Sequence, residues 1–219
     1  MKKDVIARDL GGPLSPGSRR RQRPVLVRPR PLCRHHALVN GPRGTLIAAI
    51  GAPGIVTQKR EGDGATPRAR LTPKAHFLRT RRPSALPSRI IHPADGWCDA
   101  PTSPRYNRWI KHPFPASAEH LWREDGLYDH ILITDHNQRP RVRGAGSAIF
   151  IHVARPAMTP TAGCLAFSAR DWRLARVPMG PYLVGVDQRP ERTRVALSKN
   201  ERPWQRFRRR RRPRWRQPS

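Results

Sequence analysis

Apolar runs in this chain are short, and glycine or proline interrupts almost every one before it reaches the length of a helix. The 219 residues include 25 prolines and 16 glycines. Proline lacks a backbone donor and fixes φ, so it ends helices and is excluded from interior strands. Short apolar runs bounded by such residues are typical of β-strands. The sequence therefore predicts a mainly β fold, a sandwich or partial barrel, with one or two short helices.

The strands are expected where apolar and β-branched residues gather between turn residues. In chain order the candidates are GTLIAAIGAPGIV at 44–56, with a turn at Pro53-Gly54, then HILIT at 130–134, AIFIHV at 148–153, YLVGV at 182–186 and the weaker TRVALS at 193–198. Within AIFIHV, the alternation of a strand puts His152 on one face with Ala148 and Phe150.

Two segments carry the start signal of a helix. SAEHLWRE at 117–124 begins with a serine that serves as an N-cap. In SARDW, Ser168 is followed three residues later by Asp171, which is the pattern of a capping box, and Pro178 is expected to end this helix.

The charge is concentrated at the two ends of the chain. The formal net charge is +29, of which residues 1–34 supply +8 and residues 189–219 supply +11. The runs RRRQR at 19–23 and RFRRRRRPRWR at 206–216 have no apolar periodicity that would fold them. We therefore expect a disordered basic arm at 1–23, one domain at 24–188 and a basic tail at 189–219.

A basic tail with interleaved aromatic residues (Trp204, Phe207 and Trp215) is suited to contact with a polyanion. Nucleic acid would be bound by phosphate neutralisation and base stacking, and an anionic membrane or wall polymer by charge attraction alone. A simply solvated tail explains the same residues. No signature of a nucleic-acid-binding module occurs among the expected strands, so a nucleic-acid-binding protein is an alternative that rests on charge alone.

The sequence contains neither a membrane span nor a visible export signal. No run of about 18 apolar residues occurs, so no transmembrane helix is expected. The first residues, MKKDVIARDLGG, are positively charged but lack the apolar stretch of a signal peptide.

Three cysteines, Cys33, Cys98 and Cys164, give no disulfide framework and no zinc motif, because none lies in a CxxC or comparable spacing. A bridge between Cys33 and Cys98 would leave Cys164 as a free thiol, and the sequence leaves that pairing open. No metal site is predicted.

His152 and Cys164 are the residues with the clearest chemical meaning. A loop stiffened by Pro156 and Pro160 separates them, and such a loop is able to bring its two ends close. An imidazole beside a thiol takes its proton and leaves a nucleophilic thiolate. Gly163 permits a sharp turn before the cysteine, where backbone N–H groups would hold an oxyanion. A buried structural cysteine is the alternative.

These residues resemble the L,D-transpeptidase (YkuD-type) catalytic domain family, whose pattern is a histidine, a spacer and then [ST]-H-G-C with an apolar residue. His152, Thr161, Gly163, Cys164 and Leu165 match. Three further blocks occur in the proper order and resemble the branch of the family that has IHVARP before the cysteine. They are KREGDGATP at 59–67, DGWCDAPTSPRYNR at 95–108 and LWREDGLYDHILI at 121–133. The resemblance therefore covers about 25–187.

Several positions depart from the family pattern. Ala162 stands where many members have histidine, and Ala166 where many have asparagine or arginine. The offset from His152 to Cys164 is shorter than the common spacing, and Ala69 replaces the glycine of the TPxG turn. These differences favour a second alternative, a catalytically degenerate module that only binds the cell wall.

The resemblance implies an L,D-transpeptidase-like β fold and an acyltransferase that attacks peptidoglycan peptide stems through a thioester. Cys164 would be the nucleophile and His152 the general base, with the N–H groups of Gly163 and Cys164 as the oxyanion hole. Water as the acceptor would make the site a carboxypeptidase. Arg155 and Thr161 are candidate substrate-binding residues, and Arg155 is suited to pair with a stem carboxylate. The resemblance implies no cofactor or metal, and a location in the periplasm or cell envelope.

Overall fold

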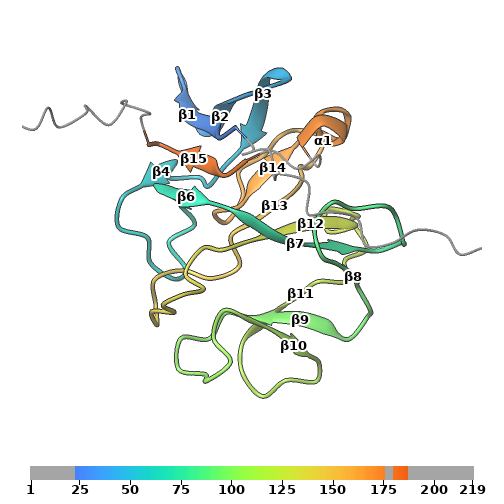
Figure 1. Cartoon of the computed structure of the whole chain (residues 1–219). Helices are drawn as coiled ribbons and strands as arrows, with labels where there is room; N and C mark the ends of the chain where they lie inside the picture. The colour runs from blue at the N-terminus through green and yellow to red at the C-terminus, as the bar shows by residue number, and fades with distance from the viewer. Residues whose placement is uncertain (1–22, 176–179, 187–219) are drawn as a thin grey trace, which may run out of the picture. The chain divides into compact units, whose positions relative to one another are not determined.

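Ten strands hydrogen-bond into one curved sheet, which forms most of the structure (Figure 1). The computed structural model describes residues 23–175 and 180–186. In spatial order the strands of this sheet are β6 (Ala69–Leu71), β15 (Tyr182–Val184), β1 (Val25–Arg30), β2 (Cys33–Gly41), β3 (Gly44–Ala49), β14 (Leu165–Phe167), β13 (Phe150–Val153), β12 (His130–Thr134), β7 (Pro73–Leu78) and β8 (Ser88–Ile90).

The chain connectivity shows how strongly this sheet bends. β6 lies at one edge of the strand order, yet β7, next to the opposite edge, begins two residues after β6 ends. Thr72 alone spans the gap, so the two ends of the sheet lie close together. No strand pairing closes the described residues into a barrel. The prediction of a mainly β, partial-barrel fold is therefore confirmed.

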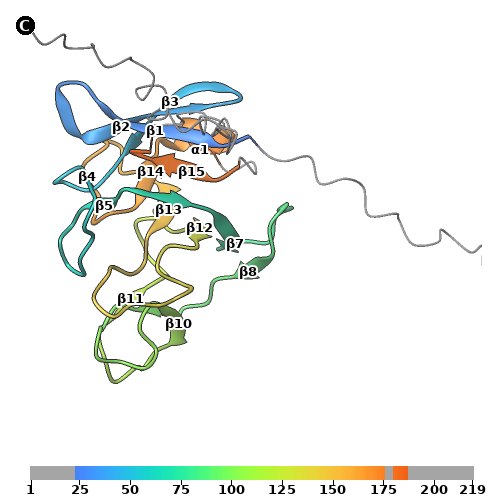
Figure 2. The same cartoon turned by 60° about the vertical axis from the view of Figure 1, so that its left-hand side comes forward.

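Two smaller sheets complete the strands. β9 (Asp95–Cys98) is the centre of a three-stranded sheet, with β10 (Arg108–Lys111) and β11 (Ala118–His120) on either side. In both Figure 1 and Figure 2 this sheet lies on the far side of β7 and β12 from β1 and β2. β4 (Ile55–Val56) and β5 (Thr66–Pro67) form a short parallel pair.

The alternation of side chains along the central strands builds two hydrophobic cores. Leu132 and Ile151 point into the core inside the curved sheet, together with Trp172 from the helix α1 (Ala169–Ala175). Their neighbours Ile131 and Phe150 point to the opposite face, into a core that is shared with the small three-stranded sheet. Because both faces are covered, β12 and β13 are apolar almost throughout.

All four strand segments predicted within the described residues form. The strand at 130–134 has the predicted bounds, 44–56 forms β3 and β4 on either side of the turn, and the strands at 148–153 and 182–186 are two residues shorter than predicted. The helix at SARDW also forms, and the Ser168 Oγ accepts a hydrogen bond from the Asp171 N–H at 3.0 Å, as a capping serine should. Pro178, the strand expected at 193–198 and the basic tail lie outside the described residues, as does the basic arm apart from Arg23.

The prediction of a helix at 117–124 is wrong. Residues Ala118–His120 instead form β11, which pairs antiparallel with β9 through Ala118 and Cys98. An isolated helix of eight residues has little stability of its own, whereas the open edge of β9 offers the backbone a full set of partners. Tertiary pairing therefore outweighs the local capping signal at Ser117.

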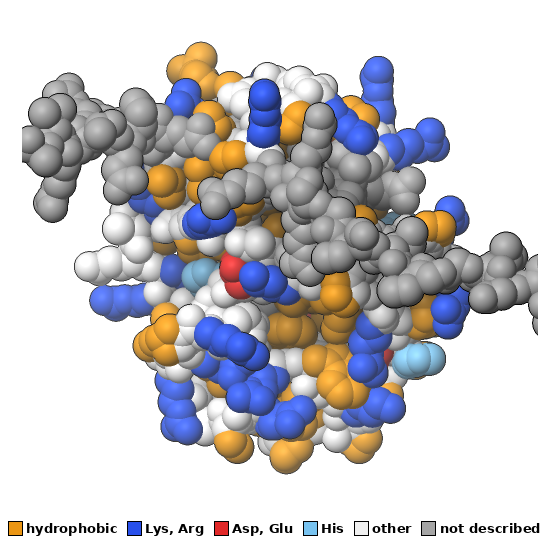
Figure 3. All heavy atoms as spheres, in the orientation of Figure 1, with side chains coloured by type: hydrophobic (Ala, Val, Ile, Leu, Met, Phe, Trp, Pro, Cys, Tyr) orange, Lys and Arg blue, Asp and Glu red, His pale blue; other side chains and the backbone are white. Residues whose placement is uncertain are grey.

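The three cysteines are free thiols, so the open question of a Cys33–Cys98 bridge is answered by its absence from the structure. Among the described residues, no helix is long and apolar enough to cross a membrane. On the face shown in Figure 3, lysine and arginine side chains are spread over the described surface and acidic side chains are few.

Replacing the capping serine tests how much the one described helix depends on it. Ser168→Ala removes the acceptor for the Asp171 N–H, so we expect the free energy of unfolding to fall by about 1 kcal/mol in urea denaturation. Ser117→Ala is the matched control, because that serine caps no helix, and we expect almost no change. Equal effects of the two substitutions would contradict the capping role.

Candidate active site

The parallel pairing of β13 with β14 brings His152 and Cys164 to one place. His152 lies on β13, and Cys164 comes directly before β14. Ile151 pairs with Leu165, and His152 pairs with Ala166. Residues 154–164 form the whole connection between the two parallel strands, and it contains no helix.

The Cys164 sulfur is held by the backbone of the strand beside it. Sγ accepts a hydrogen bond from the Phe150 N–H at 3.3 Å and donates one to the Ala148 carbonyl at 3.1 Å. The residue is 7% exposed and packs against the core that contains Phe150. A thiol that donates to a carbonyl is protonated, so this is the resting state of the cysteine.

The position of Ala148 is set by a buried asparagine. Ala148 has φ of 51°, a left-handed conformation that costs an alanine free energy and turns its carbonyl toward the thiol. Its N–H donates to Asn107 Oδ1 at 3.2 Å, and the same oxygen accepts from Trp97 Nε1 at 2.9 Å. The DGWCDAPTSPRYNR block thus supports the backbone that faces the cysteine.

The His152 ring is fixed by one hydrogen bond and one aromatic contact. Nδ1 lies 2.7 Å from the Val153 carbonyl, which only accepts, so Nδ1 carries the proton and Nε2 has the lone pair. Tyr128 packs edge-on against the ring at 5.0 Å between centroids. His152 is two residues from Phe150 on the same face of β13, a separation of roughly 6.6 Å along the strand. No hydrogen bond joins His152 to Cys164 in the described part of the chain.

Burial keeps both groups neutral. It raises the pKa of the Cys164 thiol to about 12, an effect that the nearby Glu119 charge adds to and that the Phe150 N–H and the Lys59 charge oppose. Burial also lowers the pKa of His152 to about 4, and the charges of Arg123 and Arg155 lower it further. A buried thiol and a buried imidazole hold their proton on sulfur until something else stabilises the charged pair.

Cys164 and His152 line the same pocket, which has a volume of about 530 Å³. Its walls come from five parts of the chain: the 59–64 loop, Asp99 after β9, β11 with residues 123–128, residues 147–155, and residues 159–166 around the cysteine. Charged and polar residues of the lining include Lys59, Glu61, Asp99, Glu119, Arg123, Tyr128, Ser147, Arg155, Thr159 and Thr161. Arg155 is exposed at the rim.

The turn before the cysteine is closed by Thr161. Its hydroxyl donates to the Cys164 carbonyl at 2.7 Å and accepts from the Gly163 N–H at 3.1 Å. Gly163 has φ of 132°, and a Cβ there would lie 2.6 Å from the Ala65 carbonyl, so only glycine fits. Both the Thr161 hydroxyl and the Gly163 N–H are therefore engaged within the turn in this structure.

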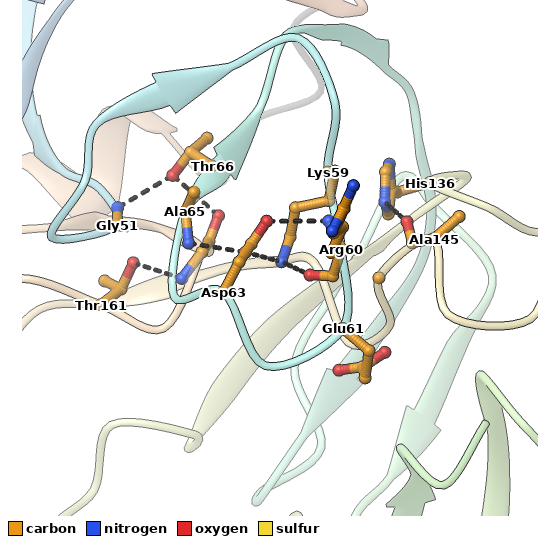
Figure 4. A network of polar contacts seen from close by, with 12 residues as sticks. Gly51, Lys59, Arg60, Glu61, Asp63, Ala65, Thr66, His136, Ala145 and Thr161 are labelled. Atoms are coloured by element: carbon orange, nitrogen blue, oxygen red, sulfur yellow. Dashed lines mark hydrogen bonds and ion pairs between the residues drawn. The ribbon is translucent and has the colours of Figure 1, made fainter.

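The 59–66 loop braces this turn from the other side (Figure 4). Thr66 Oγ1 donates to the Gly163 carbonyl at 2.9 Å and accepts from the Gly51 N–H at 2.9 Å. Asp63 shapes the loop by accepting from the N–H of Ala65 and by pairing with Lys59. Burial opposes ionisation of Asp63, but the Lys59 hydrogen bond and two backbone N–H groups bring its pKa below the ordinary value.

Sequence reasoning missed one part of the pocket wall, the group of Glu119, Arg123 and Tyr128. Glu119 accepts a hydrogen bond from the Tyr128 hydroxyl at 2.6 Å, and burial raises the pKa of this carboxyl group. Arg123 pairs with Asp125, and the hydrogen bond to Arg123 lowers the pKa of that aspartate. Arg123 and Tyr128 lie in the LWREDGLYD block, but no spacing pattern links either of them to Glu119, because the contacts arise from the pairing of β11 with β9.

The family assignment agrees with this geometry. The YkuD family model, described as the L,D-transpeptidase catalytic domain, matches residues 35–186. The match covers more than half of the chain, and the protein belongs to this family. Neither the search of curated proteins nor that of solved structures found a match.

The bridging hydroxyl of Thr66 gives a first test of the site. Thr66→Val keeps the volume but leaves the Gly51 N–H buried without its acceptor, which costs about 1–3 kcal/mol of unfolding free energy. Thr45→Val, which removes an exposed hydrogen bond to Asn40, is the control, and chemical denaturation measures both. A cost at Thr66 no larger than at Thr45 would contradict the bracing role.

The buried, neutral His152 predicts acid sensitivity. The pKa of His152 is about 4 in the folded protein, against the ordinary value of 6.5 that applies to the unfolded chain. The contribution of the neutral imidazole to stability is therefore complete above pH 6.5 and is lost as the pH falls toward 4. We expect the unfolding free energy of wild type to drop between pH 7 and pH 4 by up to about 3 kcal/mol more than that of His152→Gln. The exposed His92→Gln variant should follow wild type, and parallel curves for wild type and His152→Gln would contradict the prediction.

Proposed function

We propose that this protein is a cysteine-dependent L,D-transpeptidase that acts on peptidoglycan peptide stems through a thioester intermediate. Family membership supports an enzyme of peptidoglycan, and with it a location in the cell envelope. The observation that carries the proposal is that Cys164 and His152 line one pocket from neighbouring parallel strands.

The first half-reaction starts from the neutral pair. The Sγ proton passes to Nε2 of His152, whose Nδ1–H stays on the Val153 carbonyl. The thiolate attacks the carbonyl carbon of the peptide bond that precedes the terminal D-alanine, and the carbonyl oxygen takes the electron pair. When this intermediate collapses, the C–N bond breaks and the imidazolium returns its proton to the leaving amine, so that D-alanine departs and a thioester remains.

The oxyanion needs donors from the turn. We assign this role to the backbone N–H groups of Cys164 and Gly163. The Gly163 N–H is held by the neutral Thr161 hydroxyl in the resting structure, and an oxyanion is the stronger acceptor because hydrogen bonds to charged groups are about twice as strong. Thr161 thus stabilises the turn through the hydrogen bonds of its hydroxyl group, and it contributes to substrate binding as part of the pocket wall.

The second half-reaction releases the acyl group. An amine of a second stem attacks the thioester, its proton passes to His152, and the sulfur leaves as a thiolate that takes the proton back. Water in place of the amine gives carboxypeptidase activity. Arg155 at the rim is suited to a stem carboxylate. The half-buried Glu119, in the same pocket, is suited to the ammonium group of a stem.

The high pKa of Cys164 and the low pKa of His152 bear on when the site becomes active. The ion pair of thiolate and imidazolium is unfavourable in the free protein. A bound stem that brings its own charges and hydrogen-bonding groups into the pocket changes this balance, so we expect the thiol to react with its substrate far faster than with a simple alkylating agent.

The decisive experiment is incubation of the full chain with a muropeptide that bears a tetrapeptide stem, followed by mass spectrometry. We expect an acyl adduct on Cys164 together with released D-alanine. Cys164→Ala should form no adduct, and His152→Ala should form it about 10²–10⁴-fold more slowly, because it lacks the base. With a chelator present to exclude metal ions, Cys33→Ser, which removes a thiol outside the pocket, should behave like wild type.

Two results would contradict the proposal. An adduct on another residue would show that Cys164 is not the nucleophile. A wild-type protein that binds the muropeptide but forms no adduct at any pH near neutrality would instead be the degenerate wall-binding module to which Ala162 and Ala166 point. Binding to nucleic acid that weakens steeply with salt and is unaffected by Cys164→Ala, without an adduct, would favour the charge-based alternative.

A further inference from the structure

A second group of chemically reactive side chains lies at the start of β2, outside the pocket. Cys33, His35 and His36 each offer one ligand atom, and these three atoms lie within 4.8 Å of one another. The Cys33 Sγ and the His35 Nε2 are 3.8 Å apart. All three residues are partly buried, so they are accessible to an ion and still held by their surroundings.

A bulge in β2 explains why neighbouring histidines converge. Pro29 and Arg30 of β1 are consecutive, but they pair with Ala37 and Cys33 of β2. The residues between these two partners are therefore extra relative to β1, and they form a bulge that contains both histidines. In a regular strand His35 and His36 would point to opposite faces, whereas a bulge re-aims side chains.

The tautomer of His36 is the one that a metal ligand requires. Its Nε2 lies 2.9 Å from the Met158 carbonyl, which only accepts, so Nε2 carries the hydrogen. Its Nδ1 lies 3.5 Å from a guanidinium nitrogen of Arg30, which only donates, so Nδ1 has the lone pair. A ligating histidine commonly donates its second ring N–H to a backbone carbonyl in this way, and that bond fixes the ring.

The donor set selects the class of ion. One thiol and two imidazoles are ligands for zinc and similar borderline ions, whereas calcium and magnesium require oxygen. Metal–sulfur and metal–nitrogen bonds of about 2.3 and 2.0 Å at a tetrahedral angle separate the two ligand atoms by roughly 3.5 Å. The observed 3.8 Å between Cys33 Sγ and His35 Nε2 is close to that value.

We propose that Cys33, His35 and His36 bind a Zn²⁺-like divalent ion, with water in the fourth position. Binding releases the thiol proton of Cys33 and displaces the exposed Arg30 side chain from Nδ1 of His36. This departs from the absence of a metal site predicted from the cysteine spacing, because the bulge that assembles the site is invisible in that spacing. The proposal is independent of the function proposed for Cys164.

The site is connected to the loop between the two candidate catalytic residues. Met158, whose carbonyl accepts from His36, lies in the 154–164 connection and packs against Ala49, Ala154 and Ala166. Ala154 and Ala166 also line the pocket. An ion on Nδ1 makes the Nε2–H a stronger donor, so a bound ion holds this loop more firmly against β2.

Titration of the full, reduced chain with Co²⁺ tests the site. We expect a thiolate-to-cobalt charge-transfer band, together with the intense visible bands of four-coordinate Co²⁺, at one equivalent, and Zn²⁺ should abolish both by displacement. Cys33→Ser should lose the charge-transfer band. His35→Gln and His36→Gln should each weaken binding by at least about tenfold.

Cys164→Ser and the exposed His92→Gln are the controls and should keep the spectrum of wild type. A band that persists in Cys33→Ser, or that disappears in Cys164→Ser, would overturn the proposal, as would the absence of any band in wild type.

Amide hydrogen exchange tests the connection between the metal site and the 154–164 loop. Zn²⁺ should slow exchange in 154–164 in wild type but not in Cys33→Ser, and unchanged exchange in wild type would overturn that connection.

Discussion

Parallel neighbours in a sheet need a crossover of about a dozen residues, usually built around a helix, but residues 154–164, which join β13 to β14, contain no helix. Such a connection has no regular structure to stabilise it, so its shape depends on cross-links. Thr161 closes its end, and Thr66 ties that end to the 59–66 loop and to Gly51. These hydrogen bonds hold Cys164 beside β13, where its side chain forms part of the pocket wall.

The same tight packing decides the electrostatics. Cys164 and His152 are buried, and the cysteine packs against the core that contains Phe150, so neither a thiolate nor an imidazolium is stable there without a partner. A protein that must avoid indiscriminate reaction of its thiol benefits from this arrangement, because the charged pair forms only when a ligand supplies the missing interactions. The left-handed Ala148 shows that the backbone is strained at this point, as is common where function and stability compete.

Particular elements show how far sequence reasoning reaches. The strand HILIT and the capped helix at Ser168 were predictable because each depends on a local pattern that tertiary contacts reinforce. The segment at 117–124 also begins with a serine suited to cap a helix, but its residues Ala118–His120 form β11, because the free edge of β9 lies next to them. The cluster at Cys33 was equally hidden, since the bulge arises from the register between β1 and β2. In both cases a long-range pairing outweighs a local preference.

The sequence by itself determined that the chain is mainly β, that His152 follows Phe150 on one face of a strand, and that a glycine precedes Cys164 in a sharp turn. These features depend on period, turn chemistry and backbone freedom, which are properties of neighbouring residues. Only the tertiary structure decided what surrounds the thiol: the Ala148 carbonyl, the brace from Thr66, and the Glu119–Tyr128 pair. Those contacts join segments far apart in the chain, and the burial they create, rather than residue type, sets the charge state of the site.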